Sequence, residues 1–156
     1  MAQTNAGDPE AGTARYGLPL LYPGQAHKEV HHNEALARLD LLANMVVEGI
    51  AEIPDGLTPE PGQCWLISGT ASGIWTERRG CIAGFIDGDW VYFPPQDGQV
   101  IQVRANAARM VFRFGFWRMT PTMAQPSGGG VVDNEAREAI LMLRDALELY
   151  GLILPA

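Results

Sequence analysis

Residues 82–93 read Ile-Ala-Gly-Phe-Ile-Asp-Gly-Asp-Trp-Val-Tyr-Phe, and this stretch decides the fold. Two runs of β-branched and aromatic residues flank Asp87-Gly88-Asp89, a sequence that favours a tight turn between two strands. The stretch therefore predicts a β-hairpin. Because an isolated hairpin is only marginally stable in water, the hairpin in turn predicts further strands on either side of it.

The large aromatic residues gather around this hairpin. All four tryptophans and all five phenylalanines lie between residues 65 and 117. In the last of the expected strands we expect Phe112, Phe114 and Phe116 to point inward and Arg113 outward. Residues 62–120 are thus predicted to form one small antiparallel β-rich unit, rich in Trp and Gly. The short strands expected between its turn sequences cover 64–68, 81–86, 90–93, 100–104 and 109–117.

The chain before this unit predicts an arm and a helix. Residues 1–24 form the N-terminal arm, and a helix is predicted over 25–50 because residues 25–48 contain no Pro or Gly and Gly49 can end it. Residues 51–61 carry three prolines and predict a connector. The helix has one apolar stripe at helical spacing, formed by Leu36, Leu39, Leu42, Ala43 and Val46.

The chain after the β-rich unit predicts a flexible linker and a second helix. Residues 121–132 include two prolines and a run of three glycines, a composition that favours a flexible tether. A helix is predicted over 133–151, capped by Asp133 and stopped by Gly151. We predict that this helix oligomerises or docks on a partner through an apolar seam of coiled-coil spacing, formed by Ala136, Ile140, Leu143, Leu147 and Tyr150. The fold class is therefore predicted to be α+β.

Composition limits the partners and the site of synthesis. The chain has 11 Lys and Arg against 18 Asp and Glu, a net charge of -7 that repels phosphate backbones, so we expect no nucleic-acid partner. Apolar runs are too short to span a bilayer, and residues 1–12 lack the apolar core of a secretory signal. We therefore expect synthesis in the cytoplasm and no membrane partner. Cys64 and Cys81 are predicted to be buried, reduced thiols, with a single bridge as the alternative.

Candidate chemistry in the sequence is sparse. His27, His31 and Glu34 share a helix face, but Lys28 stands where a His-Glu-x-x-His motif has its glutamate, so no metal is predicted. No nucleophile, base and orienting group can be assembled, so we expect no enzyme and no cofactor. Exposed aromatic rings stack on sugars, which makes three residues the candidate sugar platform: Trp75, Trp90 and Tyr92.

Several motifs resemble one family of unassigned function. Its members open with G-L-P-L-L and continue with G-Q-A-Q-K-E-V-x-H-N-E-A-L, to which residues 17–20, 24–30 and 32–36 of this chain are similar. The likeness extends over roughly residues 16–118. It includes 62–67 (Gly-Gln-Cys-Trp-Leu-Ile), 71–75 (Ala-Ser-Gly-Ile-Trp), 82–85 (Ile-Ala-Gly-Phe), 88–90 (Gly-Asp-Trp) and 94–95 (Pro-Pro).

Members of that family occur in phages, prophages and gene transfer agents of alphaproteobacteria, in fibre and head-spike proteins. Residues 133–140 and 150–153 are also similar to C-terminal helices of tail-fibre proteins from the same viruses. The resemblance implies a homo-oligomer, a trimer or pentamer, that sits on the surface of a virion or phage-like particle and contacts capsid or fibre proteins. It implies that the chain either anchors the host-attachment apparatus or itself contacts host capsular polysaccharide.

Overall fold

The computed structural model describes residues 12–22, 24, 26 and 28–154. The chain divides into two compact units, unit 1 (Met1–Pro95) and unit 2 (Gln96–Ala156). Its described residues form helices and two β-sheets, so the predicted α+β class is confirmed. The boundary between the two units, at Pro95, falls inside the range 62–120 predicted for the β-rich unit.

Unit 1 is built on the predicted hairpin, which pairs β4 (Ile82–Ile86) with β5 (Asp89–Phe93). Strand β3 (Cys64–Ile67) pairs antiparallel with β4, and β2 (Gly49–Ala51) pairs parallel with β3, which gives the order β2-β3-β4-β5. The short strand β1 (Val46–Val47) precedes β2.

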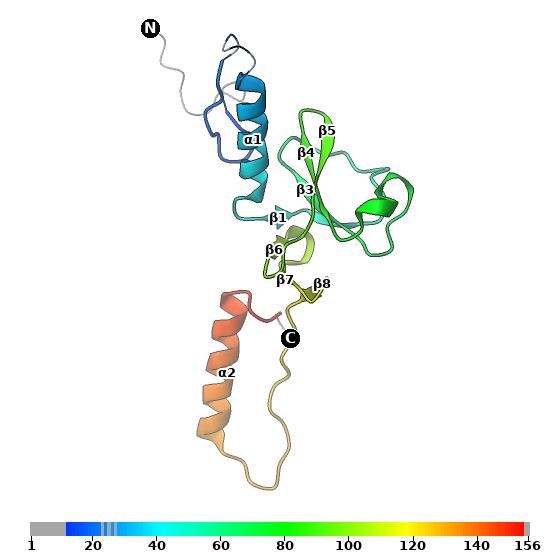
Figure 1. The fold of residues 1–156 in the computed structure, drawn as a ribbon. Helices are drawn as coiled ribbons and strands as arrows, with labels where there is room; N and C mark the ends of the chain where they lie inside the picture. The colour runs from blue at the N-terminus through cyan, green and yellow to red at the C-terminus, as the bar shows by residue number, and fades with distance from the viewer. Residues whose placement is uncertain (1–11, 23, 25, 27, 155–156) are drawn as a thin grey trace. The chain divides into compact units, whose positions relative to one another are not determined.

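The two faces of this sheet are covered by different elements. Helix α1 (Lys28–Leu42) lies beside β3 and β4 (Figure 1). Its fully buried Leu41 packs so closely on Gly84 of β4 that a Cβ there would overlap the leucine side chain. On the other face, the 3-10 helix η1 (Gly73–Arg78) inserts Trp75 into a cluster with Ile67 and Ala83.

Helix α1 is shorter than the helix predicted over 25–50. It ends at Leu42, and the next residues form β1 and β2 instead of further helical turns. The backbone leaves the helical region at Asn44, whose φ is 46°, and β-branched residues favour strands from there on. The Arg15 guanidinium also donates to the carbonyls of Leu41 and Asn44, which satisfies acceptors that a longer helix would have used.

The strands of unit 2 form an antiparallel meander. Strand β6 (Val100–Val103) leads through the 3-10 turn η2 (Arg104–Asn106) into β7 (Ala108–Arg113), which pairs with β8 (Phe116–Met119). The single strand predicted over 109–117 is therefore wrong. Phe114 and Gly115 both have positive φ, at 54° and 82°, and reverse the chain in a two-residue turn.

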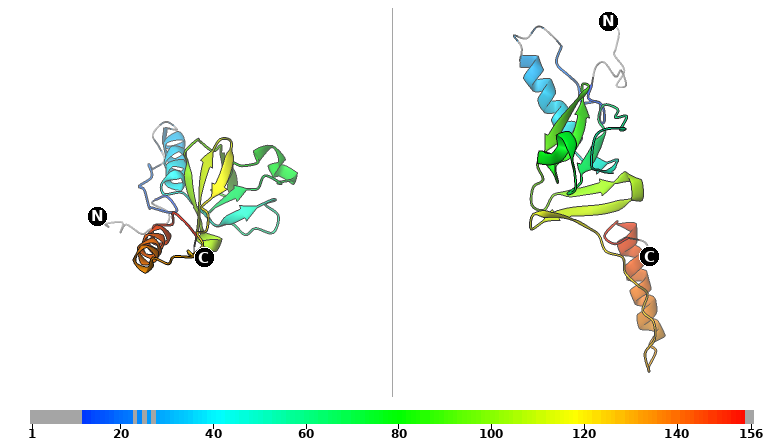
Figure 2. Two further views of the ribbon diagram at one scale, coloured as in Figure 1. Left: turned by 90° about the horizontal axis from the view of Figure 1, so that it is seen from below. Right: turned by 90° about the vertical axis from the view of Figure 1, so that its right-hand side faces the viewer.

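Helix α2 (Asn134–Leu149) lies inside the range predicted for the second helix. The predicted linker, residues 121–132, runs beside α2 in two views and the chain then turns back (Figures 1 and 2). After the helix, Leu154 pairs with Thr122, and its N–H donates to the carbonyl of Pro121 at 2.9 Å. Within the described part of the chain, no helix combines the length and the apolar character needed to cross a membrane.

Candidate functional site: the apolar face of helix α2

Helix α2 is held at both ends by backbone and side-chain hydrogen bonds. The Asp133 carboxylate accepts a hydrogen bond from the Ala136 N–H at 2.9 Å, as a helix N-cap does. At the other end Gly151 has a φ of 64°, and the Leu152 N–H donates to the Leu147 carbonyl at 2.8 Å. This geometry resembles a Schellman C-cap, so α2 is a regular helix with defined ends.

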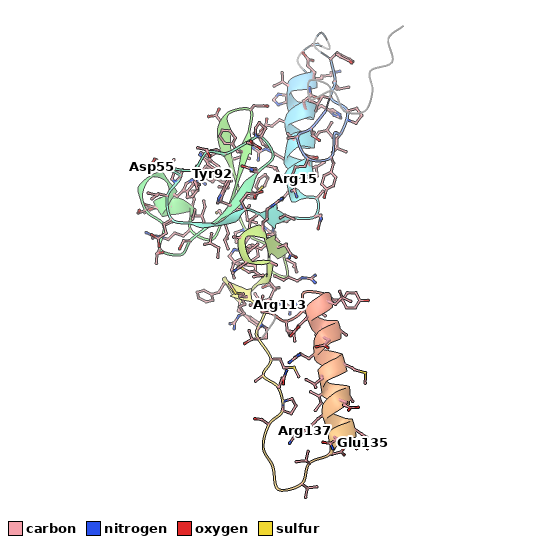
Figure 3. All side chains as sticks on the ribbon, turned by 180° about the vertical axis from the view of Figure 1, so that it is seen from behind. Arg15, Asp55, Tyr92, Arg113, Glu135 and Arg137 are labelled. Atoms are coloured by element: carbon pink, nitrogen blue, oxygen red, sulfur yellow. The ribbon has the colours of Figure 1, made fainter. Side chains whose placement is uncertain are left out.

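The side of α2 that is half-buried is mostly polar. Arg137 points toward the linker and donates to the carbonyl of Gly128 (Figure 3). Arg144 lies within 3.4 Å of the Glu148 carboxylate and 3.1 Å of the Asp145 carboxylate. The half-buried residues of α2 are Arg137, Leu141, Arg144, Leu147 and Glu148. Because most of these positions share one side of the helix, α2 turns a mixed side of three charged residues and two leucines toward its own chain.

The apolar seam of α2 adjoins this half-buried side and is largely exposed. Of the seam predicted from the sequence, Ala136, Ile140, Leu143 and Tyr150 are exposed, and Leu147 is half-buried. Leu143 is 58% and Tyr150 71% exposed, and no residue of α2 is fully buried. Exposed side chains of Met142 and Leu149 widen this surface. We call these residues together the apolar face of α2, and such a surface marks an interaction site.

The candidate sugar platform is only partly available for stacking. Trp75 is 0% exposed, so its prediction as a sugar-stacking ring is wrong. The ring instead fills the core beneath η1, where Trp90 contacts it edge-on with centroids 5.3 Å apart. Trp90 also contacts Trp65 and Phe85 edge-on, at 5.6 Å and 5.2 Å. Trp90 therefore serves first as the centre of an aromatic cluster.

Trp90 and Tyr92, the two remaining platform residues, are both half-buried. Trp90 and Tyr92 are two positions apart on β5, an edge strand of the unit 1 sheet, so they share one face. The Arg78 guanidinium lies over the Tyr92 ring, 5.0 Å from its centroid. One face of that ring is thus already occupied by a cation.

The cysteines and histidines do not assemble a reactive site in the described part of the chain. Burial raises the pKa of the Cys64 thiol to about 11 and also raises the pKa of Cys81, so both favour the unreactive thiol form. The register pairs Cys64 with Gly84, three positions from Cys81, so the alternative of an internal bridge is excluded. His27 lies outside the described residues, and no three potential metal ligands cluster among those that are described.

Residues 13–21 of the N-terminal arm are fastened to α1 by polar side chains that were not predicted from the sequence. Asp40 is buried and accepts hydrogen bonds from the Thr13 hydroxyl and from the N–H groups of Arg15 and Tyr16, at 2.8, 2.8 and 2.9 Å. Asn33 bonds both the N–H and the carbonyl of Leu21. The sequence held a signal for this set, because Asn33 and Asp40 lie seven positions apart and therefore share one face of α1.

A family model matches residues 32–118, which is more than half of the 156-residue chain. The description of that family is a protein of unknown function (DUF2793). The match covers most of α1 and all the strands from β1 to the first part of β8. Neither the curated proteins nor the solved structures gave a match to this chain.

Proposed function

We propose that this chain, which belongs to the DUF2793 family of unknown function, is a non-enzymatic structural component of a phage-like particle. It serves as a head-spike or fibre subunit of a gene transfer agent or phage, and it anchors or forms the host-attachment apparatus. The chain is made in the cytoplasm and assembles on the particle surface, and its action needs no cofactor or metal. The resemblance of residues 16–118 and of the C-terminal helix to fibre and head-spike proteins supports this class.

The orientation of α2 is the observation that carries the proposal. Packing on the protein's own core normally turns the apolar side of a helix inward. Helix α2 departs from this, because Leu143 and Tyr150 are exposed while its half-buried side holds Arg137 and Arg144 as well as Leu141 and Leu147. Burying a leucine or a similar side chain stabilises an assembly by roughly 1.5–3 kcal/mol, so covering this face provides a large driving force for association.

The partner that fits this face best is the same helix in other copies of the chain. Residues at coiled-coil spacing form one side of this face, and Met142 and Leu149 extend it beyond the narrow seam of a two-stranded coiled coil. A face this wide suits a bundle of three or more helices. The proposed state is a trimer or pentamer, on which capsid or fibre proteins of the particle dock.

The oligomer can be tested by light scattering coupled to size exclusion on the full-length chain. We expect the wild-type chain to elute as an oligomer at micromolar concentration. The double substitution Ile140→Asp with Leu143→Asp should yield monomers, because it places carboxylates in the apolar face. Glu138→Gln, at an exposed polar position of α2 outside the predicted seam, is the matched control and should leave the oligomer intact. A wild-type monomer that also fails to co-purify with particles would overturn the proposal.

Carbohydrate binding is the second candidate, favoured by Trp90 and Tyr92 on an edge strand. In this alternative the chain is a carbohydrate-binding module that recognises host capsular polysaccharide. The test is titration of capsular polysaccharide into the wild-type chain and into Tyr92→Ala, since Trp90→Ala would also damage the aromatic cluster. Binding that is lost in Tyr92→Ala and kept in Tyr150→Ala supports it. Absence of binding by the wild-type oligomer would exclude it.

A further inference from the structure

The turn between β7 and β8 exposes two aromatic rings. Phe114 is 79% and Phe116 68% exposed, so the prediction that both point inward is wrong. The Arg118 guanidinium lies 5.9 Å from the centroid of the Phe114 ring, and the exposed Arg113 immediately precedes the turn (Figure 3). We call these four residues, Arg113, Phe114, Phe116 and Arg118, the hairpin tip.

Neither local conformation nor packing accounts for phenylalanine at position 114. Its φ of 54° lies in the left-handed region, where Asn, Asp and Gly are favoured and a bulky side chain is strained. The Asp97 carboxylate accepts a hydrogen bond from the Phe114 N–H, which helps to hold the backbone in this conformation. A strained and solvent-exposed aromatic residue points to a role in binding.

The hairpin tip belongs to a basic segment of an acidic protein. Residues 98–132 contain four arginines and no Asp or Glu, whereas the whole chain has a net charge of -7. Exposed Phe and Arg together are typical of residues that dominate protein interfaces. The tip therefore fits a partner surface that is both apolar and acidic.

Unit 1 of the same protein carries a surface of that kind. Residues 48–60 contain four acidic residues and no Lys or Arg. Within and beside this segment, the side chains of Ile50, Ile53 and Ile74 are exposed. The Ser72 N–H donates to the Glu52 carbonyl at 3.1 Å, which places the start of η1 next to residues 52 and 53. We call Ile50, Ile53, Ile74, Glu52 and Asp55 the acidic isoleucine patch.

We propose that the hairpin tip of one copy docks on the acidic isoleucine patch of a second copy. The contact joins two different surfaces, so it is heterologous, and heterologous contacts are the kind that closes into rings. A trimer or pentamer requires such a contact, because two-fold contacts alone cannot generate an odd-numbered ring. The inference rests on the proposed homo-oligomer, but it uses residues separate from the apolar face of α2.

The first test separates binding from folding at position 114. Phe114→Asn places a residue that favours left-handed turns at this site, so the midpoint of unfolding should stay the same or rise. Self-association measured by sedimentation velocity should nevertheless weaken by about tenfold or more, as expected for an exposed interface aromatic. A loss of stability with unchanged association would show that Phe114 is structural and would overturn the proposal.

The second test is a charge exchange between copies, made in the full-length chain. One variant carries Arg113→Glu with Arg118→Glu, and the other carries Glu52→Lys with Asp55→Lys. Each variant alone should associate more weakly than wild type, because its two surfaces then have the same sign of charge. The equimolar mixture should recover part of the association, because opposite signs face each other wherever the two variants meet, although a ring of three or five copies keeps at least one contact between copies of the same variant. Failure of the mixture to recover would overturn the proposal.

A matched control and a salt series complete this experiment. Asp89→Lys with Glu138→Lys changes the net charge by the same amount as the patch variant but lies outside the patch, so it should associate like wild type. Rising salt should weaken the hairpin contact, because exposed charges are screened. Hairpin-dependent binding to anionic vesicles or single-stranded DNA, with self-association unchanged by the charge reversals, would assign the tip to another partner and overturn the proposal.

The contact through the apolar face of α2 and the contact through the hairpin tip can be tested separately. The double variant Ile140→Asp, Leu143→Asp lacks the α2 contact and should be monomeric at micromolar concentration. The self-association that it keeps at higher concentration and low salt should be salt-sensitive and lost on Phe114→Asn. If this double variant remains fully oligomeric and its self-association depends on Phe114, the α2 proposal fails and the hairpin proposal stands. If the double variant is monomeric even at high concentration and low salt, the hairpin proposal fails.

Discussion

Helices α1 and α2 have nearly the same length, 15 and 16 residues, but they meet their surroundings in opposite ways. Helix α1 has a weak apolar pattern, yet it is fastened to unit 1 by Leu41 on one side and by the buried Asp40. Helix α2 has a strong apolar pattern and buries none of its residues completely. In this protein, the helix with the clearer apolar stripe is the one that lacks a core of its own.

The comparison shows that amphipathic pattern and burial report different things. A polar side chain can bury a helix when the chain supplies matching donors, as Thr13, Arg15 and Tyr16 do for Asp40. A wide apolar face can remain exposed when its partner lies in another molecule. A helix held from within its own chain and a helix held by a partner should therefore respond differently to substitution.

Removing the Asp40 carboxylate should have the largest effect. Asp40→Ala leaves the Thr13 hydroxyl and two backbone N–H groups without their acceptor, which should destabilise unit 1 by roughly 3–5 kcal/mol. Denaturant unfolding followed by tryptophan fluorescence measures this change, since three of the four tryptophans lie in unit 1. A loss below about 1 kcal/mol would mean that the arm does not stabilise α1.

Crowding the contact between α1 and β4 should have the next largest effect. In Gly84→Ala the added methyl group overlaps the Leu41 side chain and approaches the Phe93 ring. Overpacking of this kind typically costs about 1–3 kcal/mol, measurable in the same unfolding experiment. The control is Gly49→Ala, where no atom lies within 4 Å of the new Cβ. Equal stability of Gly84→Ala and wild type would show that α1 is free to shift away.

Removing the cap of α2 should have a smaller effect. Asp133→Ala deletes the side chain that accepts from the Ala136 N–H, which should cost about 1 kcal/mol in α2 stability. Amide hydrogen exchange in the first turn of α2 is the direct measurement. Asp133→Asn keeps a side-chain acceptor, so its amide hydrogens in the first turn of α2 should exchange as slowly as those of wild type. Fast amide exchange in both variants would mean that the charge of Asp133, and not its hydrogen bond, stabilises the helix end.

Changing the apolar face of α2 should have the smallest effect on the stability of a single chain. Leu143 is largely exposed, so Leu143→Asp should change the free energy of unfolding of the monomer by less than about 0.5 kcal/mol. The measurement is thermal unfolding at a concentration where the chain is dissociated. A large destabilisation there would mean that Leu143 packs within its own chain, which would contradict the proposed role of α2.

Local sequence signals were sufficient for much of this fold. The β4-β5 hairpin follows from Asp87-Gly88-Asp89 between runs of strand-forming residues, and α2 lies between the expected Asp133 cap and Gly151. The end of α1 was mispredicted because residues 43–48 contain no Pro or Gly to break the helix. What ends it is Arg15, some thirty positions away, together with the left-handed Asn44.

The apolar stripe predicted on α1 fails for a similar reason. Leu39 and Leu42 are exposed, while Asp40 and Leu41 are buried. The side of a helix that faces inward depends on which other residues of the chain pack against it. Helical spacing alone predicted that Asp40 would face solvent, but it is buried. The turn at Phe114 was missed because phenylalanine is a strand former, and its local preference conflicts with the left-handed conformation it adopts.

The pairing of Thr122 with Leu154 has a mechanical consequence. The segment that contains α2 begins and ends at two residues that pair with each other, Thr122 and Leu154. A force applied at Leu154 therefore acts on this pairing and not on the helix. If the pairing were sheared apart, the residues between 122 and 154, extended at about 3.4 Å each, would release on the order of 100 Å of slack. Force spectroscopy on chains held at the β-strands and at the C-terminus should therefore record a single extension of that size, at a force set by a few hydrogen bonds.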